Sequence, residues 1–524
     1  MGFAARAHPT IVGFVDDQKF KDILMNAKST IGLVELPQLG LIDKTGKNWL
    51  IEYSHTPLMS KQILLSNLQG LGFETKLINL REGDYREGYG QVTWHDIELT
   101  KTYIGGKITA IDPSVCDAWG ITNNFSQQRE IAALAIRHLA SRGRPVVVGG
   151  SDAIAMPEPY LAAGATAVVL DKSGAANGPI LDYVLGKMSR EELSGVLLAS
   201  NPQPPPKARR SSPIENWPLP TQSVVEQCLG RDYRGLKLPT ESTRIGSVFP
   251  DIGCDRKCDF CQTPNYHLGF RAMSPKRTLQ WFETQKQAGA CMSLNGSDQF
   301  LGRVLKKGGR EEVIEIMQGI RDMELGMLWF NGLELKKLTR GRSIDRKSGA
   351  DLRPDEELIS AVFDWTGEGG SYFAYLPGER PMLGQDNCRK LLPWQEHCEI
   401  MRAIARTSLP HIRYGIIIGF EDDSDESLSR LEEALWMLYE DLMEVNPNLK
   451  FQVNAQSLSP IPGTPQSDLV RRAGLLRIDE PALYGNIWTP TIDTRYLRYD
   501  QIADWQVRLL KIGSEQFMDY GRAL

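Results

Sequence analysis

The sequence lacks any long hydrophobic run, and this absence sets the first expectations. A helix that crosses a membrane needs about 20 consecutive apolar residues, and no segment of the 524-residue chain approaches that length. The first residues also lack the apolar stretch of a secretory signal peptide. Arg6 stands where a myristoylation signal requires serine or threonine. The sequence therefore predicts a cytoplasmic protein with no membrane partner.

An excess of positive charge is absent as well. The chain has 60 lysine and arginine residues against 65 aspartate and glutamate residues, a net charge of −5. Nucleic-acid-binding domains usually carry a basic patch or stripe, so no nucleic-acid partner is expected. The apolar fraction of 41% and the charged fraction of 24% are those of an ordinary globular protein. The length suggests about two to four domains.

Cysteine is too sparse for a disulfide framework, because only eight cysteines occur in the chain. Five stand singly in apolar or helical-looking segments, where a free cysteine usually behaves as a small buried hydrophobe. These five are Cys116, Cys228, Cys291, Cys388 and Cys398. The other three are clustered, and they give the strongest functional signal in the sequence.

A proline-rich tract divides the chain. Prolines crowd residues 202–206, and others follow at positions 213, 218 and 220. Because proline interrupts helices and central strands, the tract predicts a semi-rigid, extended linker. The expected organisation is an α/β domain over residues 1–195, the linker over 196–242, a second domain over 243–470 and a small helical region over 471–524.

Before the linker, apolar β-type runs alternate with helical patterns, which indicates βαβ units and a parallel sheet. The expected strands are residues 49–53, 75–80, 118–122, 145–148 and 167–170, with helices over 59–71 and 127–141. This order fits a flavodoxin-like (Rossmann-type) domain, which binds ligands at the carboxyl ends of its strands. Residues before about 45 follow no pattern that assigns them an element.

After the linker the alternation continues on a longer scale. The expected strands are residues 246–250, 291–294, 327–330, 372–375, 414–418 and 451–456. The expected helices are residues 279–288, 310–323, 355–363, 393–405 and 426–442, and a further helix covers 499–511. Six strand–helix units predict a partial (β/α)6 barrel of the TIM type, with functional groups at the C-terminal strand ends.

The clustered cysteines, Cys254, Cys258 and Cys261, have the spacing C-x3-C-x2-C directly after the first expected barrel strand. Three thiolates on a short loop can bind three irons of a [4Fe–4S] cluster, which leaves the fourth iron open to another ligand. A zinc site is the alternative, but it usually needs four ligands in paired spacing. The nearest histidine, His267, has no second partner close in sequence.

This loop, with Phe260 before the third cysteine, resembles the signature of the radical S-adenosylmethionine (radical SAM) enzymes. The resemblance extends over residues 243–470 and implies that S-adenosylmethionine binds at the open iron. Residues 295–298 stand where the family has a turn that contacts the amino group of S-adenosylmethionine, with Asp298 as the acid. Residues 415–419 resemble the strand whose backbone lies against adenine, and residues 459–465 resemble the family's proline-glycine-threonine turn.

Two further acids, Glu334 and Glu379, lie at expected strand ends. They either bind S-adenosylmethionine or substrate, or they form a salt-bridged rim of the barrel. The residues that the resemblance and these positions assign to S-adenosylmethionine are Phe260, Asn295, Gly296, Ser297, Asp298, Glu334, Glu379 and Gly419.

A parallel sheet before such a barrel is similar to the cobalamin-binding domain of B12-dependent radical SAM enzymes. The residues assigned to cobalamin are Thr56, Pro57, Thr122, Gly149, Gly150 and Ser151. Gly149 and Gly150 would let the backbone approach a flat macrocycle or its nucleotide tail. A flavodoxin-like domain with a tight turn at the two glycines is the alternative interpretation. No Asp-x-His-x-x-Gly occurs in the sequence, so the histidine that binds cobalt from below in other B12 proteins is missing.

The resemblance implies a radical SAM methyltransferase in which methylcobalamin delivers a methyl group to an unreactive carbon of a small-molecule or peptide substrate. The electron would come from a donor such as flavodoxin or ferredoxin. Three alternatives stay open: polar methyl transfer of the kind seen in tryptophan-methylating members, a cyclisation or rearrangement without methylation, and a cobalamin-binding sensor with a degenerate barrel. A methylthiotransferase is excluded, because the N-terminal domain has no cysteine triad.

Overall fold

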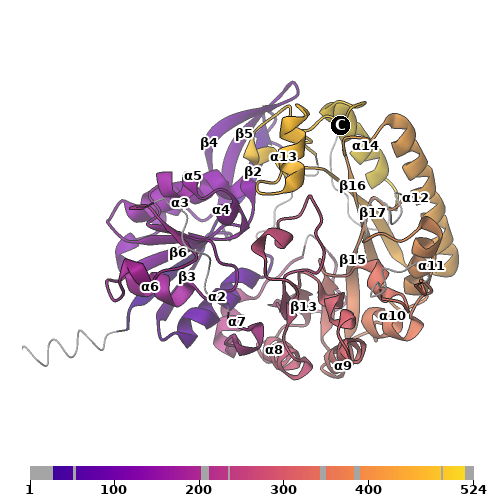
Figure 1. Cartoon of the computed structure of the whole chain (residues 1–524), viewed down its shortest axis with the longest axis horizontal. Coiled ribbons are helices and arrows are strands. Elements are labelled where there is room, and N and C mark those ends of the chain that lie inside the picture. The colour runs from indigo at the N-terminus through magenta and orange to yellow at the C-terminus, as the bar shows by residue number, and fades with distance from the viewer. Residues whose placement is uncertain are drawn as a thin grey trace, which may run out of the picture.

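The computed structural model describes residues 28–50, 55–201, 212–233, 236–342, 350–382, 390–485 and 488–513. Two α/β units lie side by side in it, and the C-terminal segment lies against both (Figure 1). Each unit is built on a sheet of six strands. Among the described residues no helix is long and apolar enough to span a membrane.

The N-terminal unit has a sheet with the order β3-β1-β6-β7-β8-β9. Its strands are β1 (Thr30–Glu35), β3 (Glu74–Asn79), β6 (Ala118–Thr122), β7 (Val146–Gly149), β8 (Ala167–Val169) and β9 (Val196–Leu198). The first five pair in parallel, and β9 pairs antiparallel to β8. The helices are α2 (Met59–Gly70), α3 (Arg129–Ala140), α4 (Ser151–Ala155), α5 (Glu158–Ala162) and α6 (Asn177–Val184). The predicted parallel α/β unit is confirmed.

The expected first strand, residues 49–53, is wrong where it can be checked. Trp49 and Leu50 are not in a strand, and residues 51–54 lie outside the described ranges. The sheet instead begins with β1, in the stretch before residue 45 to which the sequence assigned no element. Trp49 packs its ring against Trp94 with centroids 6.1 Å apart and donates from Nε1 to Asp43. The apolar character of this segment therefore serves packing against a second sheet.

That second sheet was not anticipated from the sequence. It is antiparallel, with the order β2-β5-β4, and contains β2 (Gln38–Asp43), β4 (Tyr85–Trp94) and β5 (Ile97–Gly105). The first half of β4 is exposed to solvent, so it carries no hydrophobic alternation that would mark it as a strand.

The second unit has six parallel strands in the order β10-β13-β14-β15-β16-β17, as a partial (β/α)6 barrel requires. The strands are β10 (Ile245–Val248), β13 (Met292–Asn295), β14 (Gly326–Trp329), β15 (Gly370–Glu379), β16 (His411–Ile418) and β17 (Lys450–Ser457). The helices are α8 (Pro275–Gln287), α9 (Gly309–Asp322), α10 (Glu356–Phe363), α11 (Trp394–Ala405) and α12 (Asp425–Val445). Each of these strands and helices overlaps the range expected from the sequence.

The region between the units is more ordered than an extended linker. Residues 202–211, which include the densest prolines, lie outside the described residues. Strand β9 occupies the expected start of the linker and belongs to the N-terminal sheet. Helix α7 (Gln222–Cys228) packs between α2 and α8, so this segment joins the two units through side-chain contacts.

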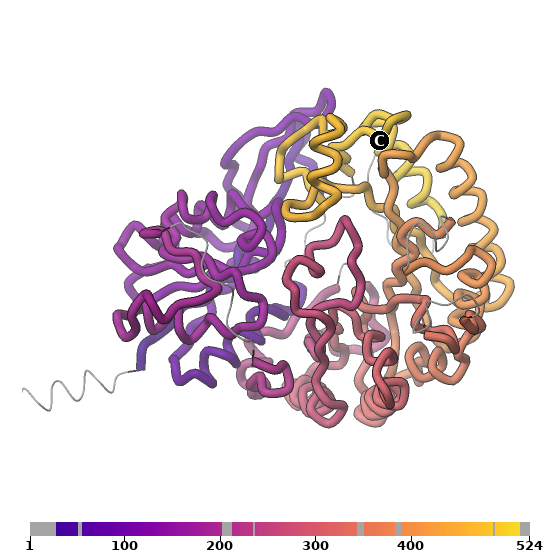
Figure 2. Tube along the Cα trace, in the orientation of Figure 1, coloured from indigo at the N-terminus to yellow at the C-terminus, as the bar shows by residue number. Residues whose placement is uncertain are grey.

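The C-terminal region contains α13 (Pro465–Arg472) and α14 (Tyr499–Leu510). Figure 2 shows this yellow segment returning to lie beside the β4–β5 hairpin of the N-terminal unit. Trp94 Nε1 donates to the Pro490 carbonyl over 2.8 Å. On the other side, α14 packs on β17, and Trp505 Nε1 donates to Asp425 at the start of α12. The segment thereby ties the two units together.

Candidate functional site

A cavity of about 690 Å³ lies between the two units. This volume is within the range of about 300–1,000 Å³ that is typical of ligand and cofactor pockets. One wall comes from the strands of the N-terminal sheet and from α2. The barrel contributes residues at the C-terminal strand ends and on α8: Phe249, Ile252, Trp281, Leu294 and Phe330. The cavity therefore faces the carboxyl ends of both parallel sheets, where α/β folds place their ligands.

Most of the residues that the sequence assigned to cobalamin line this cavity: Thr56, Pro57, Thr122, Gly149 and Gly150. Ser151 is not among the lining residues, and its backbone N–H donates to Asn124 Oδ1 over 3.0 Å. Aromatic rings from five separate segments complete the walls: Trp49, Phe125, Trp217, Tyr233 and Trp488. Apolar walls around a few polar groups are typical of a pocket that binds an organic ligand or cofactor.

Glycine stands at positions 149 and 150 for two different structural reasons. Gly150 has a φ of 107°, and a Cβ there would lie 2.1 Å from the Asn123 carbonyl oxygen, so its own backbone requires glycine. A Cβ on Gly149 would meet only the Val169 Cβ, at 3.9 Å. Gly149 is therefore the position whose missing side chain leaves room in the cavity.

A buried network of ion pairs between side chains lies beside the cavity at the ends of β1 and β3. Glu35 binds both Arg81 and Lys61, and Arg81 also donates to the Thr56 hydroxyl over 2.7 Å. Burial would raise the pKa of Glu35, but the two cations hold it below its usual value. No histidine is among the described residues that line the cavity.

The cysteine loop leaves the barrel after β10, between two short antiparallel strands, β11 (Asp251–Ile252) and β12 (Arg271–Ala272). Gly253 closes the neck of the loop with a φ of 79°, and a Cβ there would lie 1.9 Å from the Gly269 carbonyl oxygen. The Gly253 N–H donates to Asp298 Oδ2 over 2.7 Å. The acid predicted at the end of β13 thus holds the residue directly before Cys254.

All three cysteines of the loop are partly buried. Burial raises the pKa of Cys254, while the Arg256 N–H and the Lys337 charge act in the opposite direction. Among the described residues, no group of three or more His, Cys, Asp or Glu side chains is arranged to hold a metal ion. The donor set is three thiols on one constrained loop surrounded by cations, which suits the three cysteine-bound irons of a [4Fe–4S] cluster.

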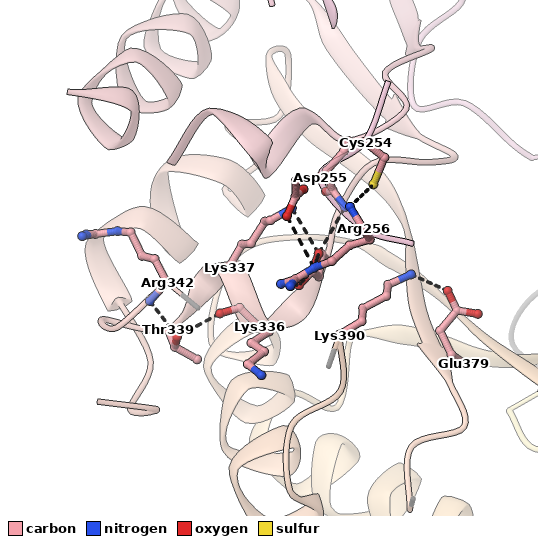
Figure 3. A network of polar contacts seen from close by, with 11 residues as sticks. Cys254, Asp255, Arg256, Lys336, Lys337, Thr339, Arg342, Glu379 and Lys390 are labelled. Atoms are coloured by element: carbon pink, nitrogen blue, oxygen red, sulfur yellow. Dashed lines mark hydrogen bonds and ion pairs between the residues drawn. The ribbon is translucent and has the colours of Figure 1, made fainter. Parts of the chain in front are cut away.

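Those cations form two groups of ion pairs beside the loop (Figure 3). Arg256 and Lys337 both bind Glu334, and Lys337 also reaches Asp255. Burial would raise the pKa of Glu334, but Lys337 and Arg256 lower it overall. Glu334 thus forms the ion pairs that the salt-bridged alternative expects.

Glu379, the second strand-end acid, pairs with Lys390 (Figure 3). Burial would lower the pKa of Lys390, but Glu379 and the nearby Cys258 raise it overall. The pair therefore places a half-buried cation close to the second cysteine. A cation beside a thiolate stabilises the charged form that binds iron.

The last residue of β13 and the two residues after it have separate surroundings. The Asn295 side-chain nitrogen is buried and has no hydrogen-bond partner among the described residues. Gly296 packs closely against α2 and the barrel, since a Cβ would lie 2.0 Å from the Met59 sulfur. The Ser297 hydroxyl donates to Asp251. An unpartnered buried amide next to the cysteine loop fits a site that binds a polar ligand.

The remaining predicted positions also border the loop. The Phe260 ring packs edge-on against the ring of Phe420, with centroids 6.2 Å apart. Phe420 is the residue that follows Gly419. Asp423 accepts the backbone N–H of Gly419 over 2.7 Å and thereby orders this turn. Gln262 donates to the Pro462 carbonyl over 2.8 Å, which attaches the loop to the proline-glycine-threonine turn. The structure brings these motifs around the three cysteines, although they are far apart in sequence.

Replacing Asp298 with asparagine is expected to weaken S-adenosylmethionine binding by about 1.5–3 kcal/mol, the range for a hydrogen bond to a charged group. Asparagine retains an acceptor for the Gly253 N–H but removes the charge that would pair with an ammonium group. The dissociation constant is measured by equilibrium dialysis on reconstituted enzyme, with Asp422→Asn, an exposed acid, as control. An unchanged constant with normal iron content would move the ammonium site elsewhere.

Sequence reasoning missed two residues that lie between the cavity and the cysteine loop, Lys172 and Tyr266. Lys172 lines the cavity with its Nζ 5.1 Å from the centre of the Tyr266 ring. Tyr266 belongs to a short 3₁₀ helix (Thr263–Tyr266) just after Cys261. The available signal was weak: a lysine two residues beyond an expected strand end, and an aromatic residue near the cysteine motif.

No family model and no curated protein sequence matches the chain. Solved structures do match. A structure of the cobalamin-dependent S-adenosylmethionine radical enzyme OxsB with aqua-cobalamin bound aligns with a TM-score of 0.64 at 14% identity, over 93% of this chain and 69% of that one.

A second similar structure is the radical S-adenosylmethionine methyltransferase TsrM from Kitasatospora setae, with tryptophan and a SAM analogue bound. It aligns with a TM-score of 0.59 at 9% identity, over 95% of this chain and 92% of that one. Each match covers more than nine-tenths of this chain and therefore extends over both α/β units. The chain therefore has the fold of the cobalamin-dependent radical SAM enzymes.

Proposed function

We propose that the protein is a cobalamin-dependent radical SAM methyltransferase that transfers a methyl group to an unreactive carbon of a small-molecule or peptide substrate. The observation that carries this proposal is the shared space between the units. One cavity is lined by Gly149 at the end of β7 and by Ile252, two residues before Cys254. A corrinoid held by the N-terminal sheet would thus face the cysteine loop.

In this proposal Cys254, Cys258 and Cys261 hold the cluster, and the cavity between Thr56, Thr122 and Gly149 holds the corrinoid. When bound, the cluster supplies an electron to S-adenosylmethionine, and the corrinoid supplies the methyl group. The protein's own residues orient these groups and exclude water from them. Electrons would come from a donor such as flavodoxin or ferredoxin.

The chain's residues have definable tasks in such a reaction. Arg256, Lys337 and Lys390 would balance the negative charge of thiolates and cluster sulfide, since each lies close to the loop. Asp298 and the unpartnered Asn295 amide would bind the polar end of S-adenosylmethionine. The aromatic walls would keep the reacting carbon away from solvent.

Polar methyl transfer is the second candidate, because TsrM, a methyltransferase of similar fold, was solved with tryptophan as substrate. A cyclisation or rearrangement is the third, because OxsB, which has a similar fold, is a cobalamin-dependent radical enzyme. The cobalamin sensor is disfavoured, because the cysteine loop is complete and pinned at its neck by Gly253 and Asp298.

One labelling experiment separates these candidates. Enzyme reconstituted without oxygen is given reduced cobalamin, a reductant and S-adenosylmethionine that carries a deuterated methyl group. The proposal expects the labelled methyl group on the corrinoid and, in addition, 5′-deoxyadenosine in the products. Label without 5′-deoxyadenosine would indicate polar transfer. Formation of 5′-deoxyadenosine without label on the corrinoid would contradict a methyltransferase.

A further inference from the structure

Lys172 is a cation that projects from the N-terminal unit into the cavity. It follows β8 and lines the cavity beside Gly174 and Asn177. Its Nζ donates to Asn124 Oδ1 over 3.2 Å and lies 5.1 Å from the centre of the Tyr266 ring. Among the described residues, no carboxylate lies within the 4.0 Å of an ion pair with Lys172.

This environment leaves the ammonium group undersatisfied. An ammonium has three N–H donors, and the structure supplies one oxygen acceptor and one ring face. Lys172 is half-buried, so its charge is only partly hydrated, and the described residues give it no ionic partner. Burial lowers the pKa of Lys172 to about 8, and the charge of Asp298 only partly opposes this effect. An anionic group bound in the cavity would give Lys172 the ionic partner that it lacks among the described residues.

Asp298 provides the opposite charge on the barrel side of the same region. Its carboxylate accepts one backbone N–H, from Gly253, and the described residues provide no ion pair for it. Burial raises the pKa of Asp298, while Gly253 and Lys172 act against the rise. Two oppositely charged side chains thus come from different units and influence each other's pKa. Both lie beside the cysteine loop, since Lys172 lies over the Tyr266 ring and Asp298 accepts the Gly253 N–H.

We propose that Lys172 and Asp298 together bind the head group of an α-amino acid, with Lys172 taking the carboxylate and Asp298 the ammonium. The inference rests on the proposed function, because S-adenosylmethionine itself carries such a head group. An amino-acid substrate is the second molecule with this chemistry. Asp298 binds the residue directly before Cys254, and this position favours S-adenosylmethionine. A molecule bound to the cluster would have its amino-acid head group beside that loop.

The first test compares S-adenosylmethionine with decarboxylated S-adenosylmethionine, which lacks the carboxylate. In the holoenzyme, Lys172→Met is expected to raise the Kd for S-adenosylmethionine at least tenfold and to leave the Kd for the decarboxylated molecule unchanged. Lys172→Arg should restore most of the affinity. The matched control is Lys107→Met, since Lys107 also lies over a tyrosine ring, that of Tyr85, but not in the cavity.

The second test addresses an amino-acid substrate. The twenty L-amino acids and their methyl esters are titrated into wild-type and Lys172→Met holoenzyme by calorimetry. Binding of a free amino acid that is lost in the methyl ester and in the variant would assign the site to substrate. The proposal is overturned if Lys172→Met leaves the Kd for S-adenosylmethionine unchanged and no amino acid binds in a Lys172-dependent way.

A third outcome is also decisive. Cobinamide lacks the phosphate-containing tail of cobalamin. If Lys172→Met weakens binding of cobalamin but not of cobinamide, the lysine serves the corrinoid phosphate and the amino-acid site is wrong. Failure of the proposed function would look different, because wild-type enzyme would then place no labelled methyl group on the corrinoid.

Discussion

Enzyme in which Cys258 is replaced with alanine is expected to purify with almost no iron and without the broad visible absorption of an iron–sulfur cluster. Three cysteines from one loop supply the protein's thiolates, and a cluster that loses one of three ligands is not held. Iron analysis and ultraviolet–visible spectra of anaerobically reconstituted protein measure this loss. S-Adenosylmethionine cleavage should vanish with it.

Cys398→Ala is the matched control, because Cys398 is also partly buried but lies on α11 away from the loop. It should retain full iron content. If the triple alanine variant of Cys254, Cys258 and Cys261 still bound about four irons per chain, the cluster would have other ligands and the radical SAM assignment would be wrong.

The second large effect is expected from Gly149→Leu, which should purify with an intact iron–sulfur spectrum but with little corrinoid. A leucine side chain at this position would occupy space in the cavity, since Gly149 lines the cavity and a Cβ there meets only the Val169 Cβ, at 3.9 Å. A tightly packed ligand cannot accommodate several extra methylenes, and overpacking typically costs about 1–3 kcal/mol. Cobalamin content after anaerobic reconstitution is the measurement.

Gly149→Ala provides a graded control and should bind cobalamin nearly as well as the wild type. Gly150 is not suitable for this test, because any side chain there meets the Asn123 backbone and would disturb the fold itself. Bound cobalamin should also show the spectrum of a form without a histidine nitrogen on cobalt. Wild-type protein that binds no cobalamin would make the N-terminal unit a substrate or partner domain.

The barrel could be predicted from the sequence because most of its strands are rich in apolar residues and its helices repeat their apolar residues along one face. All six strands and five helices were placed within a few residues. The N-terminal sheet was harder. Residues 49–53 have the composition of a strand, yet Trp49 packs beside Trp94, and β1 was overlooked. Exposed β4 had no pattern to recognise.

The sequence by itself determined the features that depend on neighbouring residues: the cysteine spacing that suits a cluster, the alternation of strands and helices in the barrel, and a pair of glycines at positions 149 and 150 after a strand. Only the tertiary structure distinguished Gly150, which its own backbone requires, from Gly149, which leaves room in the cavity. It also showed Glu334 paired with Arg256 and Lys337. These outcomes depend on long-range packing, because the groups that decide them come from distant parts of the chain.

The same reason applies to Lys172 and Asp298. Each is an ordinary charged residue in its local sequence, and no spacing rule connects them. They come near one another because the carboxyl ends of two separate parallel sheets face a single cavity, and the low polarity of that cavity makes their charges matter. Local sequence therefore determined which chemistry the loop can hold, and the docking of the two units decided which side chains face it.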